Sequence, residues 1–437
     1  MNLTKLLYPG MHLKRWILLL SGSLVLTGLG IAYILADIYH VQELPEVAGV
    51  LTLQFFDRPL RGAIFIGIGI VGVTVAILRL HQSLLVAFVR ERDGQIVQTI
   101  YNYRFRQRGP KVVVIGGGTG LSVALRGLKA HTSNLTAIVT VADDGGSSGR
   151  LRESLGVLPP GDLRNCMVAL ADAEPLMEDL FQYRFNGGGG LDGHSFGNLF
   201  IVAMGAVTGS FEQALKEASR VLAVRGQVLP STLEPVTLSA EMEDTGTVRG
   251  ESNISASGRR IRRVYLQPDN PRGYPEAITA IREADLIVIG PGSLYTSILP
   301  NLLVGEIGNA LTSSTALTVY ACNVATQPGE TDHYNVSDHV EALLRHLAGG
   351  RDPFHHIVAN NHFGLPMPSS GRVAPVTPDD RALRERARQI VLADVVDESN
   401  PVRHDSAKLA ATLIHLYYAK GGGRQIRDEA RASLLPA

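Results

Sequence analysis

Residues 111–120 read KVVVIGGGTG, an apolar, β-branched run that passes directly into a glycine loop. The run at 112–115 predicts a strand buried on both faces, as in a parallel sheet. Apolar side chains then recur at helical spacing: Leu121, Ala124, Leu125 and Leu128. A strand, a glycine loop and a helix in this order present backbone N–H groups to an anion. We therefore predict an α/β domain with a mostly parallel, Rossmann-like sheet and a phosphate loop at Gly117, Gly118, Thr119 and Gly120.

The loop matches neither of the two common nucleotide fingerprints. The dinucleotide motif G-x-G-x-x-G would place its third glycine at position 121, which is Leu121. This mismatch argues against an NAD-dependent enzyme. No lysine follows the glycines as it does in a Walker P-loop. A purely structural tight turn is the alternative to a phosphate loop.

Paired carboxylates follow the second predicted strand, residues 135–141. Asp143 and Asp144 stand at its end, and Ser147 and Ser148 come after two glycines. Ligands bind beyond the carboxyl ends of parallel strands. Two carboxylates there can accept ribose hydroxyls, hold a divalent cation such as Mg²⁺, or act as a base. The serines add hydrogen-bonding groups with little bulk. An ordinary polar turn is the competing interpretation.

A second glycine loop follows the predicted strand at 285–289. It reads GPGS and ends with Gly292 and Ser293, and Tyr295 comes two residues later. Two such loops in one sheet indicate a ligand with separated polar ends, such as a nucleotide sugar. Tyr295 is a candidate to stack on a base or sugar, and a core tyrosine is the alternative. Asn323, at the end of the next predicted strand, is a candidate base or sugar contact.

Four further polar residues lie near predicted helix starts. Asp162 and Asn165 follow the rigid turn at 159–161, and His194 and Asn198 open an apolar helix. Polar side chains at a helix N-terminus suit anion or sugar binding. Helix capping alone would explain Asp162, and a structural histidine would explain His194.

Arginines and histidines give weaker signals. Arg150 and Arg152 face either phosphate oxygens or solvent. His355, His356 and His362 are close in sequence, but their spacing matches no standard zinc motif. We therefore predict no metal site from the histidines.

The composition excludes some classes of protein. The 437 residues contain 41 Lys+Arg and 41 Asp+Glu, and this balance argues against a globally basic protein that binds nucleic acid. Cys166 and Cys322 are the only cysteines. They lie far apart, so neither a disulfide scaffold nor a structural zinc site is expected. Such cysteine usage fits a reducing compartment.

The first hundred residues predict a membrane hairpin. Residues 16–36 and 62–78 are uncharged, and the second apolar pattern continues to about residue 80. A helix of about 20 apolar residues spans a bilayer, so we expect transmembrane helices at about 16–36 and 62–80. A signal peptide is the alternative for the first and a buried core helix for the second. The G-x-G-x-x-G match at 67–72 lies inside the second run and indicates close helix packing.

Basic residues set the expected orientation of the hairpin. They precede the first span and follow the second in larger number, from Arg79 to Lys111. By the positive-inside rule both ends are cytoplasmic, which predicts a multi-pass protein of the cell membrane with its C-terminal domain on the cytoplasmic side. The expected organisation is a membrane segment at 1–109, an α/β domain at 110–420 and a flexible tail at 421–437. Within the α/β domain we expect an antiparallel insert at about 235–265 and two late helices at 378–390 and 406–418.

Several long motifs resemble one known family. They are VIGGGTG at 114–120, TVADDGGSSGRLR at 140–152, PPGD at 159–162, GHSFGN at 193–198 and GPGSLYTS at 290–297. Together they closely resemble the gluconeogenesis factor family of the YvcK type, over about residues 110–418. The wider superfamily includes 2-phospho-L-lactate transferase (CofD), which makes a deazaflavin coenzyme precursor from a guanylylated substrate. The N-terminal hairpin departs from the better-known members, which look soluble.

The resemblance implies a Rossmann-like sheet with a nucleotide sugar, typically UDP-N-acetylglucosamine, bound across the loops. It also implies a role in cell shape and wall synthesis during growth on gluconeogenic carbon sources. The family's matching loops carry over to Gly117, Gly118, Thr119, Asp143, Asp144, His194, Asn198 and Tyr295.

Two functions follow as hypotheses. The first is a membrane-attached regulator that binds a UDP-N-acetylglucosamine-like ligand and need catalyse nothing. The second is a CofD-like transferase that moves a phospho-acyl group from a nucleotide diphosphate ester to an acceptor, with paired aspartates and Mg²⁺ neutralising the leaving phosphate.

Beyond Mg²⁺ with a bound nucleotide, no cofactor is expected. The expected partners are the nucleotide sugar and the membrane, but no nucleic acid; a homo-oligomer and a regulatory protein partner stay open.

Overall fold

The computed structural model describes residues 106–420, apart from 173–174, 245, 348–350, 368–372 and 386–388, together with scattered positions between 22 and 74. The chain divides into two compact units, Met1–Arg104 and Phe105–Ala437. In the first unit, the described positions at 22–32 and 59–74 are helical. Much of the two predicted spans, and all of the tail at 421–437, lie outside the described residues. No helix among the described residues combines the length and the apolar character that crossing a bilayer requires.

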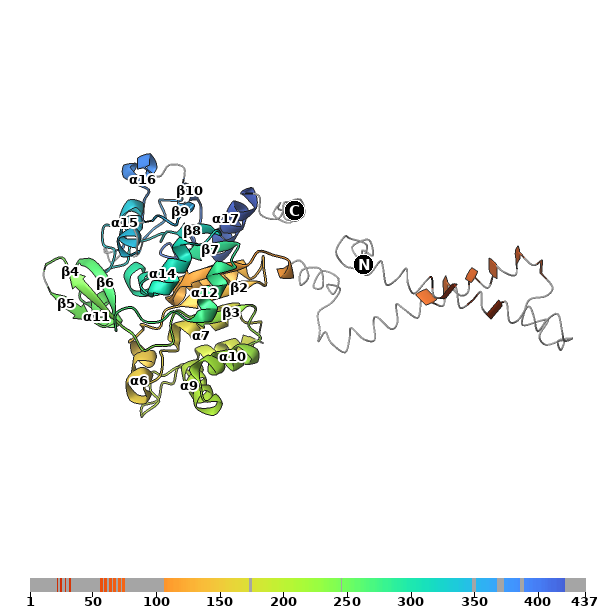
Figure 1. The fold of residues 1–437 in the computed structure, drawn as a ribbon, viewed down its shortest axis with the longest axis horizontal. Helices are drawn as coiled ribbons and strands as arrows, with labels where there is room; N and C mark the ends of the chain where they lie inside the picture. The colour runs from red at the N-terminus through yellow and green to blue at the C-terminus, as the bar shows by residue number, and fades with distance from the viewer. Residues whose placement is uncertain are drawn as a thin grey trace. The chain divides into compact units, whose positions relative to one another are not determined.

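The second unit is built on a sheet of seven parallel strands (Figure 1). The strands are β1 Val112–Gly116, β2 Leu135–Val139, β3 Gln227–Pro230, β7 Leu286–Ile289, β8 Leu317–Ala321, β9 His356–Asn360 and β10 Ile390–Ala393. Their order is β10-β9-β8-β7-β1-β2-β3, and each neighbouring pair is parallel. Every residue of β1, β2, β7 and β8 is buried, as their apolar runs predict. The predicted α/β fold with a parallel sheet is confirmed.

Helices cover the sheet in two layers. They are α5 Gly118–Leu128, α6 Gly146–Leu155, α7 Gly161–Leu170, α8 Pro175–Gln182, α9 Phe196–Thr208, α10 Phe211–Val221, α11 Glu251–Ala256, α12 Pro275–Arg282, the π-helix η2 Leu294–Ile298, α13 Leu299–Leu302, α14 Gly305–Thr312, α15 Val336–His346, α16 Asp380–Glu385 and α17 Ser406–Ala419. Helix α5 packs on α7 and α17, and α12 packs on α14. Because the chain reverses its direction across the sheet at β1, right-handed crossovers place these two groups on opposite faces. The apolar positions predicted for α5 are all fully buried: Leu121, Ala124, Leu125 and Leu128.

The predicted antiparallel insert is also present. It consists of β4 Thr237–Met242, β5 Thr247–Arg249 and β6 Ile261–Gln267, in the order β5-β4-β6. Both strand pairs are antiparallel. Ile261 and Val264 of β6 are buried, whereas Arg262 and Arg263 are exposed. An edge strand with one charged side discourages pairing with another chain.

The predicted helix at 378–390 is correct only in part, at α16 Asp380–Glu385. Helix α16 ends at Glu385, and β10 begins at Ile390 and pairs in parallel with β9 at the edge of the sheet. A strand of four residues is too short for its periodicity to be read reliably. The segment is a strand because it pairs with β9, and this pairing is a tertiary interaction.

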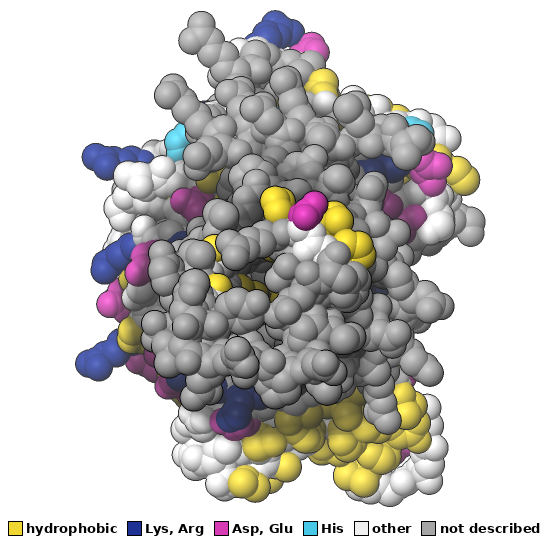
Figure 2. Space-filling model, turned by 90° about the vertical axis from the view of Figure 1, so that its right-hand side faces the viewer, with side chains coloured by type: hydrophobic (Ala, Val, Ile, Leu, Met, Phe, Trp, Pro, Cys, Tyr) yellow, Lys and Arg dark blue, Asp and Glu magenta, His cyan; other side chains and the backbone are white. Residues whose placement is uncertain are grey.

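Exposed apolar side chains gather over α8, α9 and α10. Figure 2 shows hydrophobic side chains grouped at the lower end of the molecule, where Figure 1 places α9 and α10. Leu176 of α8 and Val207 of α9 are 78% and 83% exposed. Helix α9 carries no charged residue and buries only Gly197, Asn198 and Ile201. This helix therefore presents an apolar surface to solvent along much of its length.

Candidate functional site

A cavity opens where the order of the sheet reverses. Strands β2 and β3 lie on one side of β1, and β7 to β10 lie on the other. Open α/β sheets bind ligands outside the carboxyl ends of the strands at such a reversal. The cavity has a volume of about 350 Å³, and its described walls come from residues 117–120, 123, 291–293, 297, 323–328, 373 and 402–404. We call it the loop cavity, because both predicted glycine loops line it.

The first glycine loop ends in the N-terminus of α5. Gly117 is the N-cap of α5 and has no side chain with which to cap the helix. The first N–H groups of a helix lack partners within it and carry its positive dipole end. Gly118, which has a φ of +63°, donates its N–H to Asp162. Thr119 and Gly120 follow on the cavity wall, so the α5 N-terminus offers anion-binding donors there.

The two glycine loops touch through their backbones. A Cβ atom on Gly120 would lie 2.7 Å from the Pro291 carbonyl oxygen and 2.9 Å from the Gly292 backbone. Asn323 fixes the second loop, because its Oδ1 accepts the Gly292 N–H at 3.2 Å and its Nδ2 donates to the Gly292 carbonyl at 2.8 Å. Ser293 lies on the same wall. The structure therefore brings Gly292, Ser293 and Asn323 together with the first loop.

Four carboxylates lie beside the first glycine loop, and we call Asp143, Asp144, Asp162 and Glu251 the carboxylate cluster. A Cβ atom on Gly117 would lie 2.6 Å from Oδ2 of Asp162. Burial, and then repulsion from Asp143, raises the pKa of Asp162 to about 7. Burial, and then repulsion from Asp143, also raises the pKa of Glu251 to about 8. Carboxyl groups that titrate near neutral pH are typical of functional sites.

Asp144 joins the insert to the main sheet. Its Oδ2 accepts the N–H of Glu251 at 3.0 Å, and its Oδ1 accepts the N–H and the hydroxyl of Ser252 at 2.9 and 2.8 Å. Asp144 therefore holds the first turn of α11. Sequence reasoning missed Glu251, because no local pattern shows that the insert folds back onto this edge of the sheet. Its only sequence signal is the Gly250-Glu251 step that directly follows β5.

The predicted residues Ser147, Ser148, His194 and Asn198 form a buried network. Ser147 Oγ lies 3.0 Å from His194 Nδ1 and accepts from Asn198 Nδ2 at 3.1 Å. Ser148 Oγ accepts the N–H of Gly161 at 3.1 Å. The network ties together the N-terminal ends of α6, α7 and α9. It lies apart from the described walls of the loop cavity.

Asn165 lies next to a buried arginine. Its Oδ1 accepts from Arg164 Nη2 at 2.8 Å, and Arg164 Nη1 also donates to the hydroxyl of Ser195. Burial, and then repulsion from Arg184, lowers the pKa of Arg164 to about 10. Asn165 thus positions Arg164 and is not part of the loop cavity.

Tyr295 is placed differently from the prediction. Its side chain is fully buried, and its hydroxyl lies 2.8 Å from that of Tyr334. Its ring packs edge-on against Tyr334 and His346, and its N–H donates to Glu330. The π-helix η2 thus directs the tyrosine into the core, and the core interpretation is correct.

Two residues of the C-terminal segment line the loop cavity and were missed by sequence reasoning. Arg403 is the only Lys or Arg among the described residues of the cavity wall, and its side chain is exposed. His404 is buried, and its Nε2 donates to the Cys322 carbonyl at 3.1 Å. Burial lowers the pKa of His404 to about 4. The only local signal is their place directly before Asp405, the N-cap of α17.

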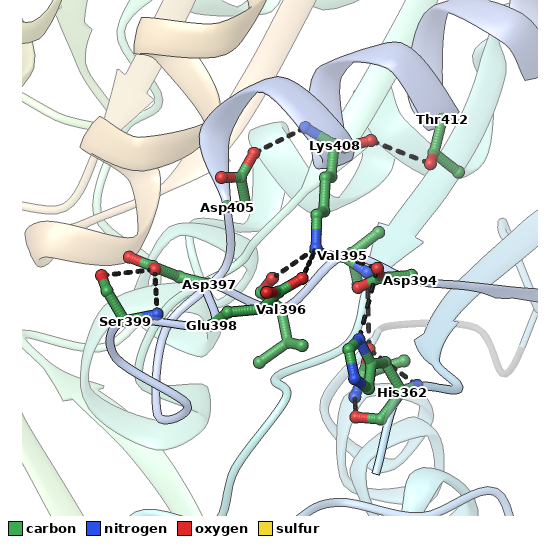
Figure 3. Close-up of polar contacts among 11 residues, drawn as sticks. His362, Asp394, Val395, Val396, Asp397, Glu398, Ser399, Asp405, Lys408 and Thr412 are labelled. Carbon is green, nitrogen blue, oxygen red and sulfur yellow. Dashed lines mark hydrogen bonds and ion pairs between the residues drawn. The ribbon is translucent and has the colours of Figure 1, made fainter. Parts of the chain in front are cut away.

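The histidines at 355, 356 and 362 do not converge on one site. Among the three, His362 forms an ion-pair contact in the described structure, with Nδ1 3.3 Å from Asp394 Oδ2 (Figure 3). Lys408 Nζ lies 2.8 Å from Asp394 and 3.0 Å from Glu398. His362, Asp394 and Glu398 are close enough to share a metal ion, but the ammonium group of Lys408 already lies between the carboxylates. The cluster therefore joins α17 to the end of β10 as an ion-pair network.

Comparisons with known proteins agree with this architecture. The family model described as 2-phospho-L-lactate transferase CofD matches residues 112–418. The gluconeogenesis factor of Bacillus subtilis is 52% identical over 313 residues, which are 70% of this chain and 98% of that protein. A Nostoc relative named after the same factor is 46% identical over 427 residues, covering 94% of this chain and 92% of the relative. A crystal structure from Bacillus halodurans covers 70% of this chain and 100% of its own, at 47% identity and a TM-score of 0.66.

The match spans all seven strands of the sheet and both glycine loops. The identity to the Nostoc relative extends over nearly the whole chain, including most of its N-terminal part. The chain therefore belongs to the CofD family, and within it to the proteins named gluconeogenesis factor.

Proposed function

We propose that the protein is a membrane-attached gluconeogenesis factor that binds a nucleotide sugar of the UDP-N-acetylglucosamine type in the loop cavity. Its role would be regulatory, in cell shape and wall synthesis under gluconeogenic growth. The observation that carries the proposal is the N-terminus of α5, whose Thr119 and Gly120 lie on the cavity wall where the two glycine loops meet. A volume of about 350 Å³ lies within the usual range of small-molecule sites.

In this proposal the diphosphate lies on the N–H groups of Thr119 and Gly120. Arg403, which also lines the cavity, supplies a guanidinium group, and such a group can bind two phosphate oxygens at once. The sugar and the base extend along residues 291–293, 297 and 323–328. The buried network of Ser147, His194 and Asn198 holds the helix ends in place and need not touch the ligand.

The carboxylate cluster fits a divalent cation that arrives with the nucleotide. Mg²⁺ is usually bound by one or two carboxylates together with substrate phosphates. Asp143 and Asp162 are hard oxygen donors in a site where burial opposes their charge, so a cation there would relieve that cost. Mg²⁺ would supply charge neutralisation next to the diphosphate.

Calorimetry on the full-length protein in mild detergent tests which class of ligand the protein binds. UDP-N-acetylglucosamine, GDP and NAD are titrated in turn, with and without Mg²⁺. We expect saturable binding of the UDP sugar and none of NAD, because the dinucleotide fingerprint fails at Leu121. Binding of NAD alone would refute the proposal.

The substitution Arg403→Gln should weaken binding of UDP-N-acetylglucosamine at least about tenfold, since a hydrogen bond to a charged group contributes about 1.5–3 kcal/mol. Arg282→Gln is the matched control, because Arg282 is an exposed arginine of α12 outside the cavity. Equal affinity of the two variants, measured by calorimetry, would exclude contact between Arg403 and the ligand.

A CofD-like transferase is the second candidate function. The observation that favours it is the raised pKa of Asp162 and of Glu251 in the carboxylate cluster, because either group could take a proton from an acceptor hydroxyl. If GDP binds and the UDP sugar does not, and if binding requires Mg²⁺, the transferase replaces the regulator.

The membrane attachment predicts a definite topology. A cysteine introduced by Glu46→Cys, between the two predicted spans, should react with a membrane-impermeant maleimide in intact cells. Asp269→Cys, at an exposed position of the second unit, should react only after lysis. The native thiols of Cys166 and Cys322 are buried, so their background labelling should be low. Labelling of E46C only after lysis would refute the orientation.

A further inference from the structure

A second, larger cavity lies next to the carboxylate cluster. Its volume is about 970 Å³, and Asp144 of the cluster is part of its wall. The other walls come from the start of α6, the segment before α9 and the edges of the insert strands β4 and β5. Four arginines line it: Arg150, Arg152, Arg184 and Arg249. We call it the arginine cavity.

Three of the four arginines of this cavity are held by neutral acceptors. Arg150 Nη2 donates to the Asp192 carbonyl at 2.7 Å, and Arg184 Nη1 donates to the Gly193 carbonyl at 3.1 Å. Arg152 Nη2 donates to the carbonyl of Val236 and the hydroxyl of Thr237. Within the described part of the chain, none of the four guanidinium groups forms an ion pair.

The carboxylates on the wall do not neutralise this charge. Only Asp144 and Glu153 line the cavity among the described acidic residues. Both oxygens of Asp144 already accept hydrogen bonds from the first turn of α11. Four guanidinium groups against two carboxylates leave the cavity with a net positive charge, and such a concave surface concentrates anions.

One donor in the cavity wall has no partner. Nη1 of Arg152 is buried and lacks a hydrogen-bond acceptor among the described residues. A buried donor on a charged group is costly when it is left unsatisfied. Beside it, α6 begins without a side-chain cap, and a Cβ atom on Gly146 would meet no other atom within 4 Å. An unpaired guanidinium donor therefore lies within a residue of the wall, and the start of α6 has open space at Gly146.

We propose that the arginine cavity binds a phosphate-bearing small molecule, a phosphomonoester or a diphosphate, at the same time as the loop cavity holds its own ligand. The guanidinium group of an arginine can bind two phosphate oxygens at once, and a bound anion would compensate the charge of the four arginines that line the cavity. Because Asp144 lines the arginine cavity and also holds α11, the second ligand lies against the insert. The proposal stands independently of the identity of the first ligand.

The test uses inorganic pyrophosphate as the probe and calorimetry on the full-length protein, with UDP-N-acetylglucosamine present at saturation so that the diphosphate site of the loop cavity cannot take up the probe. Arg249 is exposed and makes no side-chain hydrogen bond in the described structure, so Arg249→Gln should fold normally. We expect this variant and Arg150→Gln each to weaken pyrophosphate binding at least about tenfold. Arg282→Gln removes the same charge at an exposed site outside the cavity and should bind like the wild type.

A second measurement separates the two cavities. Gly118→Val, which should block the loop cavity, is expected to retain pyrophosphate binding at wild-type affinity. Arg249→Gln is expected to retain wild-type affinity for UDP-N-acetylglucosamine. The proposal is overturned if the wild type does not bind pyrophosphate, if R249Q and R282Q bind it equally well, or if G118V no longer binds it.

Discussion

The substitution Asp162→Asn should raise the free energy of unfolding by about 2–4 kcal/mol at pH 8 and leave it nearly unchanged at pH 4. Burial and the neighbouring Asp143 raise the pKa of Asp162 from 3.8 to about 7 in the folded protein. In the unfolded chain the carboxyl group ionises near its ordinary value. An asparagine cannot ionise, but its Oδ1 can still accept the N–H of Gly118.

The sign follows from proton binding. Between about pH 4 and pH 7 the folded wild type binds more protons at Asp162 than the unfolded chain does. Its stability therefore falls as the pH rises through this window, and the loss is complete above pH 7. The D162N variant has no ionisable group at position 162, so its stability does not fall in this way as the pH rises. Urea denaturation followed by circular dichroism from pH 4 to pH 8 measures the difference.

Asp269→Asn is the control for this series. Asp269 is exposed, so its replacement should not change the pH dependence. If D162N is no more stable than the wild type at pH 8, the folded protein holds Asp162 as a stabilised carboxylate, and the N–H of Gly118 outweighs burial. A buried carboxyl group that lowers the stability of the folded protein is often kept in a functional site because the chemistry of the site requires it.

The second large effect is expected at Gly118. Replacing it with valine should abolish measurable binding of UDP-N-acetylglucosamine, a loss of about 100-fold or more. The residue lines the loop cavity with a φ of +63°. A β-branched side chain there would occupy the space next to the helix N-terminus and would cost about 1–2 kcal/mol in backbone strain. Calorimetry measures the affinity, and thermal unfolding measures the strain.

Gly156→Val separates strain from blockage. Gly156 caps the C-terminal end of α6 with a φ of +67°, is exposed, and has open space around its Cβ position. This variant should lose similar stability and keep full affinity for the UDP sugar. If G118V and G156V bind the UDP sugar equally well, the α5 N-terminus is not the phosphate site.

Local patterns predicted the centre of the fold correctly. The strand at 112–115, the glycine loop and the buried face of α5 all follow from residues within about 20 positions of one another. Each depends on apolar periodicity and on glycine, which are properties of short segments. The second loop at 290–293 was found in the same way, and the structure places it against the first through Gly120.

Features that depend on distant contacts could not be predicted. Glu251 reaches the carboxylate cluster only because the insert folds back and Asp144 holds α11. Arg403 reaches the loop cavity from the segment before α17. Tyr295 shows the opposite case: its place after a glycine loop suggested a ligand contact, and the π-helix buries it against Tyr334. Sequence spacing does not determine which way such a side chain points.

The most direct test of the central claim is a crystal structure of the protein with UDP-N-acetylglucosamine bound. We predict diphosphate oxygens at hydrogen-bond distance, about 2.7–3.2 Å, from the backbone nitrogens of Thr119 and Gly120, with Arg403 on the opposite side. A ligand bound elsewhere, with no phosphate oxygen at the α5 N-terminus, would contradict the claim.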